Sequence, residues 1–81
     1  MNERARIMMV EDSESLSAVY SAYLADRPYS VVTAADLEAA RRELGRQQPD
    51  IVLLDIELPD GSGMDLLDEL VALESPPQVI V

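Results

Sequence analysis

The 81-residue sequence contains no cysteine, no histidine and no lysine. Without cysteine the chain has neither a disulfide framework nor thiolate ligands, and without histidine as well any metal ion must be held by oxygen. No apolar run approaches the roughly 20 residues that cross a bilayer, and residues 1–4 do not resemble a signal peptide. We therefore expect a cytoplasmic protein that makes no membrane contact and binds a hard cation if it binds a metal.

Acidic and aliphatic residues dominate what is present. Sixteen acidic residues against six basic ones, all arginines, give a net charge of −10, and hydrophobic residues make up 48% of the chain. This hydrophobic fraction is typical of a globular protein, and the length predicts one domain, residues 1–81. The negative charge argues against direct binding of nucleic acid, whose phosphates would be repelled.

Two short apolar runs each end in acid. Residues 51–54 are an uninterrupted aliphatic run that ends at Asp55, and residues 6–10 lead directly into Glu11 and Asp12. Residues 51–54, which are bounded by turn residues, indicate a strand that is buried on both faces of a parallel sheet, and residues 6–10 indicate another strand. The carboxylates then emerge at the carboxyl ends of the strands, where open α/β sheets place their binding sites.

Helical periodicity separates the strands. The first stripe is expected to face the sheet and consists of Leu16, Val19, Tyr20, Tyr23 and Leu24. Two further stripes lie in residues 37–44 and 64–71. The first helix could be capped by Asp12 or Ser13, and the second by Thr33 or Asp36. For the third helix, residues 62–65 form a capping-box pattern.

The alternation of strands and helices predicts the fold class. With further strands at residues 29–33 and 78–81, the pattern is β-α-β-α-β-α-β, which implies an α/β, flavodoxin-like, doubly wound parallel sheet. The strand order 2-1-3-4 fits best. In that order the strands that end at Asp12 and Asp55 are neighbours, so Glu11, Asp12 and Asp55 converge in one crevice.

This crevice suggests phosphoryl chemistry. Three neighbouring carboxylates repel one another unless a cation lies among them, and Mg²⁺ is the usual oxygen-ligated ion where a phosphate takes part. A carboxylate can attack a phosphoryl group and carry it as an acyl phosphate. We therefore expect Asp55 to accept a phosphoryl group while Asp12, assisted by Glu11, holds Mg²⁺.

The same residues belong to longer motifs. These are Val10-Glu11-Asp12, then the segment from Pro49 through Asp55 to the Leu58-Pro59-Asp60-Gly61 turn, then Gly63-Met64-Asp65-Leu66-Leu67. Over residues 6–81 they resemble the receiver domain of two-component response regulators, and most closely the receivers of sigma-54-dependent activators of the LuxO type.

The resemblance implies a partner and a ligand set. The partner would be a sensor histidine kinase or a phosphotransfer protein, whose phosphohistidine supplies the phosphoryl group to Asp55. The metal ligands would be Glu11, Asp12, Asp55 and the backbone carbonyl of Glu57. Family members more often have two aspartates where this chain has Glu11 and Asp12.

A larger departure from the family lies beyond the fourth strand. Receivers carry a Ser or Thr at the end of that strand and a Lys after the fifth, and this chain ends before both positions. The resemblance thus predicts a receiver that lacks the fifth strand and the last two helices. With no lysine to stabilise the transferring group, it should bind Mg²⁺ better than it signals.

Two other functions remain open. An aspartyl-nucleophile phosphatase would also place Asp55 at a strand end, but its second aspartate would stand where this chain has Glu57. Alternatively, the chain is an interaction module that is not phosphorylated. The edge at residues 79–81 and the face bearing Leu16 and Tyr23 would then favour a homodimer, a swapped oligomer or pairing with the missing segment in trans. The receiver interpretation makes the chain a signalling module rather than an enzyme.

Overall fold

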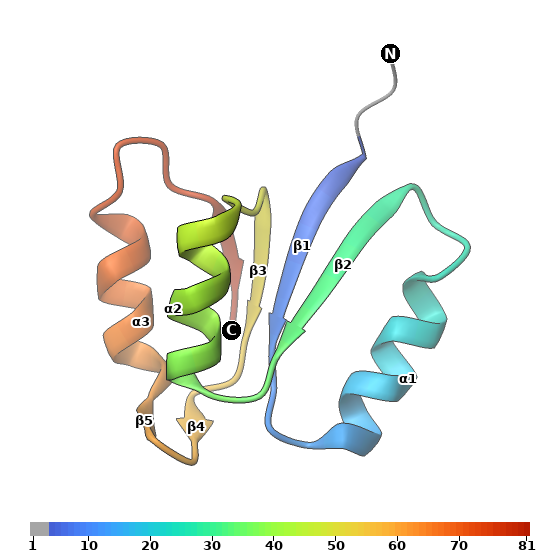
Figure 1. Cartoon of the computed structure of the whole chain (residues 1–81), viewed down its shortest axis with the longest axis horizontal. Coiled ribbons are helices and arrows are strands. Elements are labelled where there is room, and N and C mark those ends of the chain that lie inside the picture. The colour runs from blue at the N-terminus through green and yellow to red at the C-terminus, as the bar shows by residue number, and fades with distance from the viewer. Residues whose placement is uncertain (1–3) are drawn as a thin grey trace.

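The computed structural model describes residues 4–81 as one parallel sheet with three helices and a short hairpin (Figure 1). The sheet contains β1 (Ala5–Val10), β2 (Tyr29–Ala34), β3 (Ile51–Leu54) and β6 (Gln78–Ile80). The helices are α1 (Glu14–Leu24), α2 (Leu37–Arg46) and α3 (Gly63–Val71), and the hairpin pairs β4 (Glu57–Leu58) with β5 (Gly61–Ser62). Among the described residues, no helix has the length and apolar character needed to cross a membrane.

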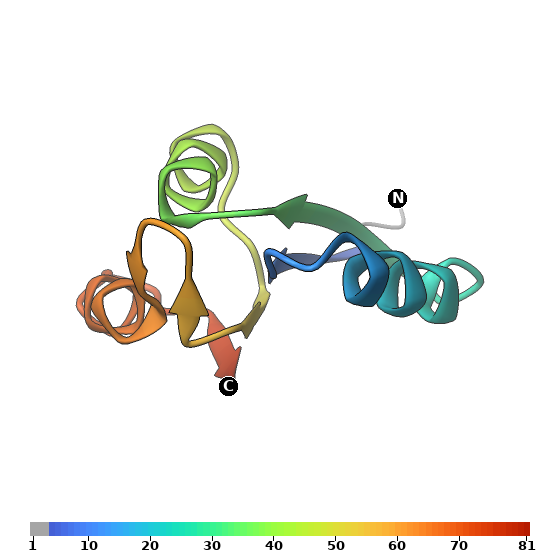
Figure 2. The ribbon, with the colours of Figure 1, turned by 90° about the horizontal axis from the view of Figure 1, so that it is seen from below.

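The strand order is β2-β1-β3-β6, with all neighbours parallel. Because β6 is the fourth strand of this sheet along the chain, the predicted order 2-1-3-4 and the α/β class are confirmed. Figure 2 shows α2 and α3 on one side of the sheet and α1 on the other, as right-handed crossovers of a doubly wound sheet require. The turn predicted at residues 58–61 is present, and it connects β4 to β5 at the tip of the hairpin.

The core lies between the sheet and the pair α2 and α3. Along β3 the side chains alternate, so Val52 and Leu54 are buried in this core while Ile51 and Leu53 are half-buried on the other face. Leu66 and Leu70 of α3 are completely buried against them. Removing a side chain of this size from water stabilises the fold by about 1.5–3 kcal/mol.

The prediction that the α1 stripe packs against the sheet is wrong. Leu16 is 44% exposed, Val19 61% and Tyr23 66%, and α1 has no buried residue. The physical reason is that α1 packs against the edge strand β2, so the sheet covers little of the helix surface. The ring of Tyr23 instead contacts the guanidinium of Arg27, whose Cζ lies 4.9 Å from the ring centroid.

The structure resolves the alternatives for the helix caps. Ser13 caps α1 by accepting a hydrogen bond from the N–H of Leu16 (3.3 Å), and Asp36 caps α2 by accepting one from Ala39 (2.7 Å). Ser62 caps α3. Each side chain satisfies one of the N–H groups that a helix start leaves without an intrahelical partner.

Candidate functional site

Three of the four predicted site residues meet at the carboxyl ends of β1 and β3. These strands pair with Val10 opposite Leu54, so the residues that come next leave the sheet at the same edge. Glu11, Asp12 and Asp55 each offer a carboxylate oxygen, and these three atoms lie within 4.8 Å of one another. We call these three residues the acidic cluster.

The backbone of the acidic cluster is fixed by the neighbouring strands. The N–H of Glu11 donates to the carbonyl of Ala34 (2.9 Å), and the N–H of Asp55 donates to the carbonyl of Val10 (3.0 Å). The ladder thus continues one residue beyond β1 and β3. This continuation holds the first acid of each loop in a defined place, with Glu11 and Asp55 half-buried and Asp12 exposed.

Local hydrogen bonds orient two of the three carboxylates. Glu11 accepts from the N–H of Ser13 (3.1 Å), and Oδ1 of Asp55 accepts from the N–H of Glu57 (3.2 Å). Glu57, the fourth predicted ligand, begins β4 with an exposed side chain, and its carboxylate is not among those of the acidic cluster. Glu57 therefore contacts Asp55 through its backbone N–H and not through its carboxylate.

The loop after Asp55 is closed tightly. The N–H of Gly63 donates to the carbonyl of Ile56 (2.6 Å), and a Cβ at position 63 would overlap the carbonyl oxygen of Asp55. The sequence motif contains this glycine, but the close approach that requires it depends on how α3 meets the end of β3. That packing is invisible in a local pattern.

Sequence reasoning also missed the contact of Asp60, which it interpreted as a turn residue. The carboxylate of Asp60 accepts from the N–H of Leu37 (2.8 Å) and from the N–H of Glu38 (3.0 Å). These N–H groups, that of Leu37 foremost, lower the pKa of Asp60 below its ordinary value. Its partners lie 22 and 23 residues earlier in the chain, so no periodic signal points to them.

A cavity of about 340 Å³ adjoins the acidic cluster on the α1 side of the sheet. Glu11 and Asp55 form its polar end, and Tyr20, Leu53 and Ile80 are among its apolar lining residues. Its wall thus combines two residues of the acidic cluster with the poorly covered face of the sheet.

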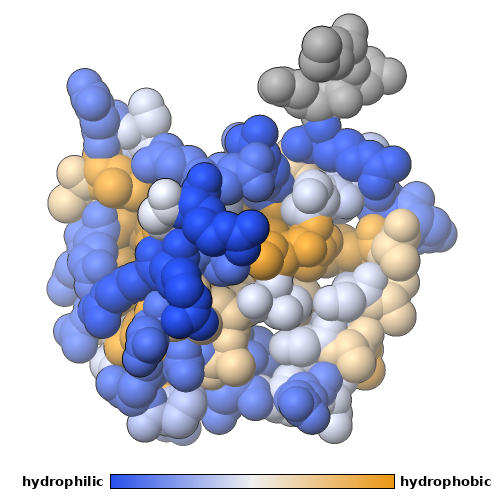
Figure 3. Space-filling view, in the orientation of Figure 1, coloured by the Kyte–Doolittle hydropathy of each residue, from blue (hydrophilic) through white to orange (hydrophobic). Residues whose placement is uncertain are grey.

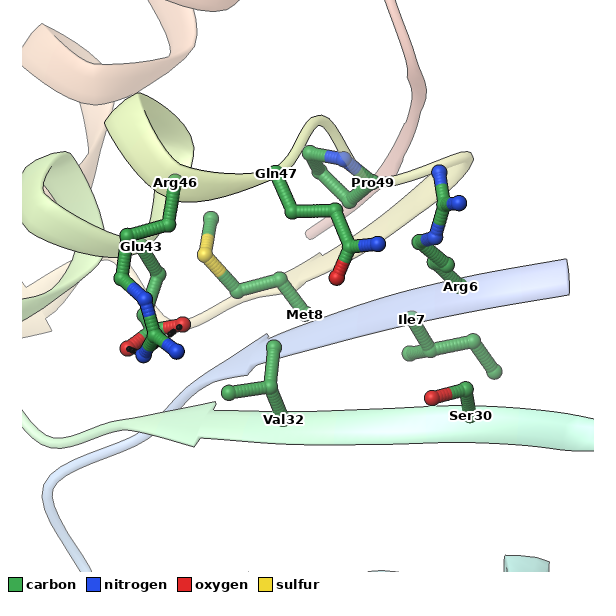
Figure 4. A pocket seen from close by; sticks show the side chains of 9 residues that line it. All are labelled: Arg6, Ile7, Met8, Ser30, Val32, Glu43, Arg46, Gln47 and Pro49. Carbon is green, nitrogen blue, oxygen red and sulfur yellow. Dashed lines mark hydrogen bonds and ion pairs between the residues drawn. The ribbon is translucent and has the colours of Figure 1, made fainter.

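The larger cavity, of about 420 Å³, lies away from the acidic cluster, between the start of the sheet and the end of α2. Figure 4 shows Arg46 beside Glu43 from α2, with Met8 and Val32 pointing into the space from β1 and β2. In the space-filling view, apolar side chains are exposed in the hollow between α2 and β2, framed by hydrophilic ones (Figure 3). Arg46 is already paired with Glu43 (3.1 Å).

A family model, that of the response regulator receiver domain, matches residues 7–81. The chain belongs to this family. The receiver's fold is also that of the signal receiver domain described as belonging to a LuxO repressor protein from Vibrio parahaemolyticus. The two have a TM-score of 0.88 and 36% identity over 95% of this chain and 59% of the other. The resemblance to LuxO-type receivers is thus confirmed.

Two further proteins are similar to this receiver, one in structure and one in sequence. A structure of the response regulator TrrA from Thermotoga maritima, in complex with Mg²⁺-BeF, superimposes with a TM-score of 0.86 at 27% identity, covering 95% of this chain and 67% of that one. A protein-glutamate methylesterase/protein-glutamine glutaminase of Rhizobium etli is 36% identical over 100% of this chain and 24% of its own length. The receiver spans about a quarter of the length of such methylesterases.

Family membership gives the chain a place in signal transduction. It is a receiver domain of the two-component response regulator type, and such domains generally work with histidine kinases. The chain spans 59% and 67% of the length of the two receiver structures named above. The roles of Glu11, Asp12, Asp55 and Glu57 stay predictions.

Proposed function

We propose that residues 1–81 form one receiver unit in which Asp55 accepts a phosphoryl group from the phosphohistidine of a sensor kinase or phosphotransfer protein. The observation that carries this proposal is the convergence of Glu11, Asp12 and Asp55 at the carboxyl ends of adjacent parallel strands. Asp55 suits the role of nucleophile because it is half-buried and its backbone is anchored to β1.

The chemistry is an exchange of one bond to phosphorus for another. A carboxylate oxygen of Asp55 forms a bond to phosphorus while the phosphorus–nitrogen bond of the donor breaks, and the electron pair of that bond stays with the imidazole. The product is an aspartyl phosphate. The N–H of Glu57, which already contacts Oδ1 of Asp55, keeps the carboxylate oriented during the approach.

The acidic cluster fits Mg²⁺. Its donors are all carboxylate oxygens, which hard cations prefer, and oxygens within 4.8 Å of one another can contact one ion directly or through the waters it retains. We assign Asp12 and Asp55 as ligands, with the Glu57 carbonyl as a third and Glu11 contributing through water. When bound, Mg²⁺ would neutralise the charge of the transferring phosphoryl oxygens.

The rate of transfer should be low in this chain. No lysine is present to place an ammonium on the phosphoryl group, and losing one such electrostatic contact slows a reaction by roughly 10²–10³-fold. We therefore expect Mg²⁺ binding to be easier to observe than phosphorylation.

The first test is chemical labelling of Asp55. The chain is incubated with acetyl phosphate and MgCl₂ and then weighed by mass spectrometry, and we expect a slow gain of one phosphoryl group that Asp55→Asn abolishes. Asp68→Asn is the matched control, because Asp68 is an exposed acid of α3, and it should label like the wild type. Persistent labelling of Asp55→Asn would contradict the assignment.

A second proposal concerns assembly and is favoured by the edge of the sheet. Within the described sheet, β6 pairs with β3 on one side, and Ile80 and Val81 are 52% and 65% exposed. Such an edge offers hydrogen-bonding groups and apolar side chains to a second strand. We propose that the 81-residue chain self-associates here as a homodimer or swapped oligomer, which fits the alternative of an interaction module that is not phosphorylated.

A further inference from the structure

Asp60 lies at the tip of the β4–β5 hairpin, in the loop that carries Asp55 and Glu57. This loop leaves the sheet after β3 and returns where the N–H of Gly63 donates to the carbonyl of Ile56 (2.6 Å). The loop is therefore closed at its base, close to the acidic cluster, and Asp60 stands at its far end. The short, hydrogen-bonded hairpin connects Glu57 to Asp60.

At the tip, Asp60 meets the first turn of α2. Its two carboxylate oxygens accept from the N–H groups of Leu37 (2.8 Å) and Glu38 (3.0 Å), while Asp36 accepts from Ala39 (2.7 Å). The first three N–H groups of α2 thus all bind carboxylates. Asp36 is the local cap of the helix, whereas Asp60 reaches it from a separate element, and the positive end of the helix dipole favours both anions.

The backbone at this contact requires a glycine. Gly61 has a φ of 151°, which L side chains rarely adopt, and a Cβ there would lie 2.7 Å from Cδ1 of Leu37. The hairpin therefore approaches α2 more closely than a residue with a side chain would allow.

We propose that Asp60 is a positioning residue that couples the acidic cluster to α2. By binding the first turn of α2, it holds the loop of Asp55 and Glu57 in the arrangement that binds Mg²⁺, and it passes a change at the cluster on to the start of the helix. This inference rests on the proposed function, because it assumes that the acidic cluster binds Mg²⁺.

Electrostatics favour an arrangement in which Asp60 binds α2 while the acidic cluster stays separate. The N–H groups of Leu37 and Glu38 keep Asp60 ionised, and Arg41, one turn further along α2, adds a favourable charge. The carboxylate of Asp60 therefore binds the start of α2 and is not one of the three carboxylates of the acidic cluster.

The test compares two carboxylates that cap the same helix. Asp60→Ala and Asp36→Ala each remove one carboxylate that accepts hydrogen bonds from the first turn of α2, but Asp36 does not belong to the hairpin. Mg²⁺ affinity is measured by titration calorimetry with MgCl₂ alone, and we expect Asp60→Ala to weaken it about tenfold, as for residues that orient metal ligands. Asp36→Ala should leave the affinity unchanged.

Amide NMR measures the coupling between the acidic cluster and α2 directly. In the wild type and in Asp36→Ala, the N–H signals of Leu37 and Glu38 should shift as MgCl₂ is added, and in Asp60→Ala they should not respond. If Asp60→Ala does not fold, Asp60→Asn serves in its place, since it keeps one acceptor oxygen and should bind Mg²⁺ with intermediate affinity.

The outcomes separate the two proposals. Equal losses of Mg²⁺ affinity in Asp60→Ala and Asp36→Ala, or no loss in Asp60→Ala, would overturn the positioning role and leave the proposed function standing. A wild-type chain that neither binds Mg²⁺ nor labels at Asp55 would refute the proposed function, and the positioning role with it.

Discussion

At the scale of single residues, a methyl group at position 63 would overlap the carbonyl oxygen of Asp55 and lie 2.9 Å from Cα of Ile56. Both neighbours are backbone atoms of the loop that presents Asp55, so neither can rotate away as a side chain would. Gly63→Ala must therefore push α3 away from the end of β3 or distort the loop. Either change would disturb the backbone around Asp55 in the candidate site.

We expect Gly63→Ala to lower the free energy of unfolding by about 1–3 kcal/mol, the usual effect of overpacking a well-packed position. Gly45→Ala is the matched control, because a Cβ at position 45 meets nothing within 4 Å and Gly45 lies inside α2. Alanine there should stabilise the chain by up to about 1 kcal/mol. Urea unfolding measures both values, and equal midpoints for the two variants would contradict the role of Gly63.

At the scale of elements, the contact of the β4–β5 hairpin with α2 should depend on pH. The N–H groups of Leu37 and Glu38 lower the pKa of Asp60 in the folded chain, so the ionised form is the one that stabilises the fold. The stabilisation is complete above the ordinary carboxyl pKa of about 3.9 and is lost as the pH falls through the lower folded value.

The measurement is the difference in melting temperature between the wild type and Asp60→Asn, taken from pH 7 downward. We expect a difference in favour of the wild type that is constant at neutral pH and shrinks below about pH 4. Asp68→Asn removes the same charge from the exposed face of α3 and provides the background. A difference for Asp60→Asn that grows as the pH falls would mean that the ionised carboxylate does not stabilise the contact.

The sequence predicts those elements whose signals are local and strong. The aliphatic runs that become β1 and β3 indicate the strands, and right-handed crossovers then determine the strand order and bring Glu11 and Asp12 near Asp55. The alternatives for the helix caps also include the correct residues, Ser13 and Asp36.

Other features could not be predicted because they depend on packing between distant segments. The stripe of α1 has the right periodicity, but a period reports which residues share a helix face and not how much of that face is covered. Tyr23 is therefore exposed despite its place in the stripe. Similarly, the contact of Asp60 with α2 joins residues that are 22 and 23 positions apart in the sequence, and only the folded structure reveals it.

At the scale of the whole molecule, a net charge of −10 opposes association while the open edge of the sheet favours it. Apolar side chains also gather next to this edge, since the cavity of about 340 Å³ is lined by Tyr20, Leu53, Ile80 and Val81 among others. Charge repulsion between exposed groups is screened by salt, whereas strand pairing and apolar burial are not. The balance should therefore shift toward association as the salt concentration rises.

We expect light scattering to show a monomer–dimer equilibrium that depends on protein concentration and moves toward dimer at higher salt. Ile80→Lys places a charge on β6, a common device against edge pairing, and should return the chain to monomer. Val71→Lys is the control, because Val71 is 59% exposed on α3, close to the 52% of Ile80. It should leave the equilibrium unchanged, since α3 covers the opposite side of the sheet from the cavity at β6. Dimers of Ile80→Lys as stable as those of the wild type would place the interface elsewhere, and a wild type that stays monomeric at high concentration and salt would remove the case for self-association.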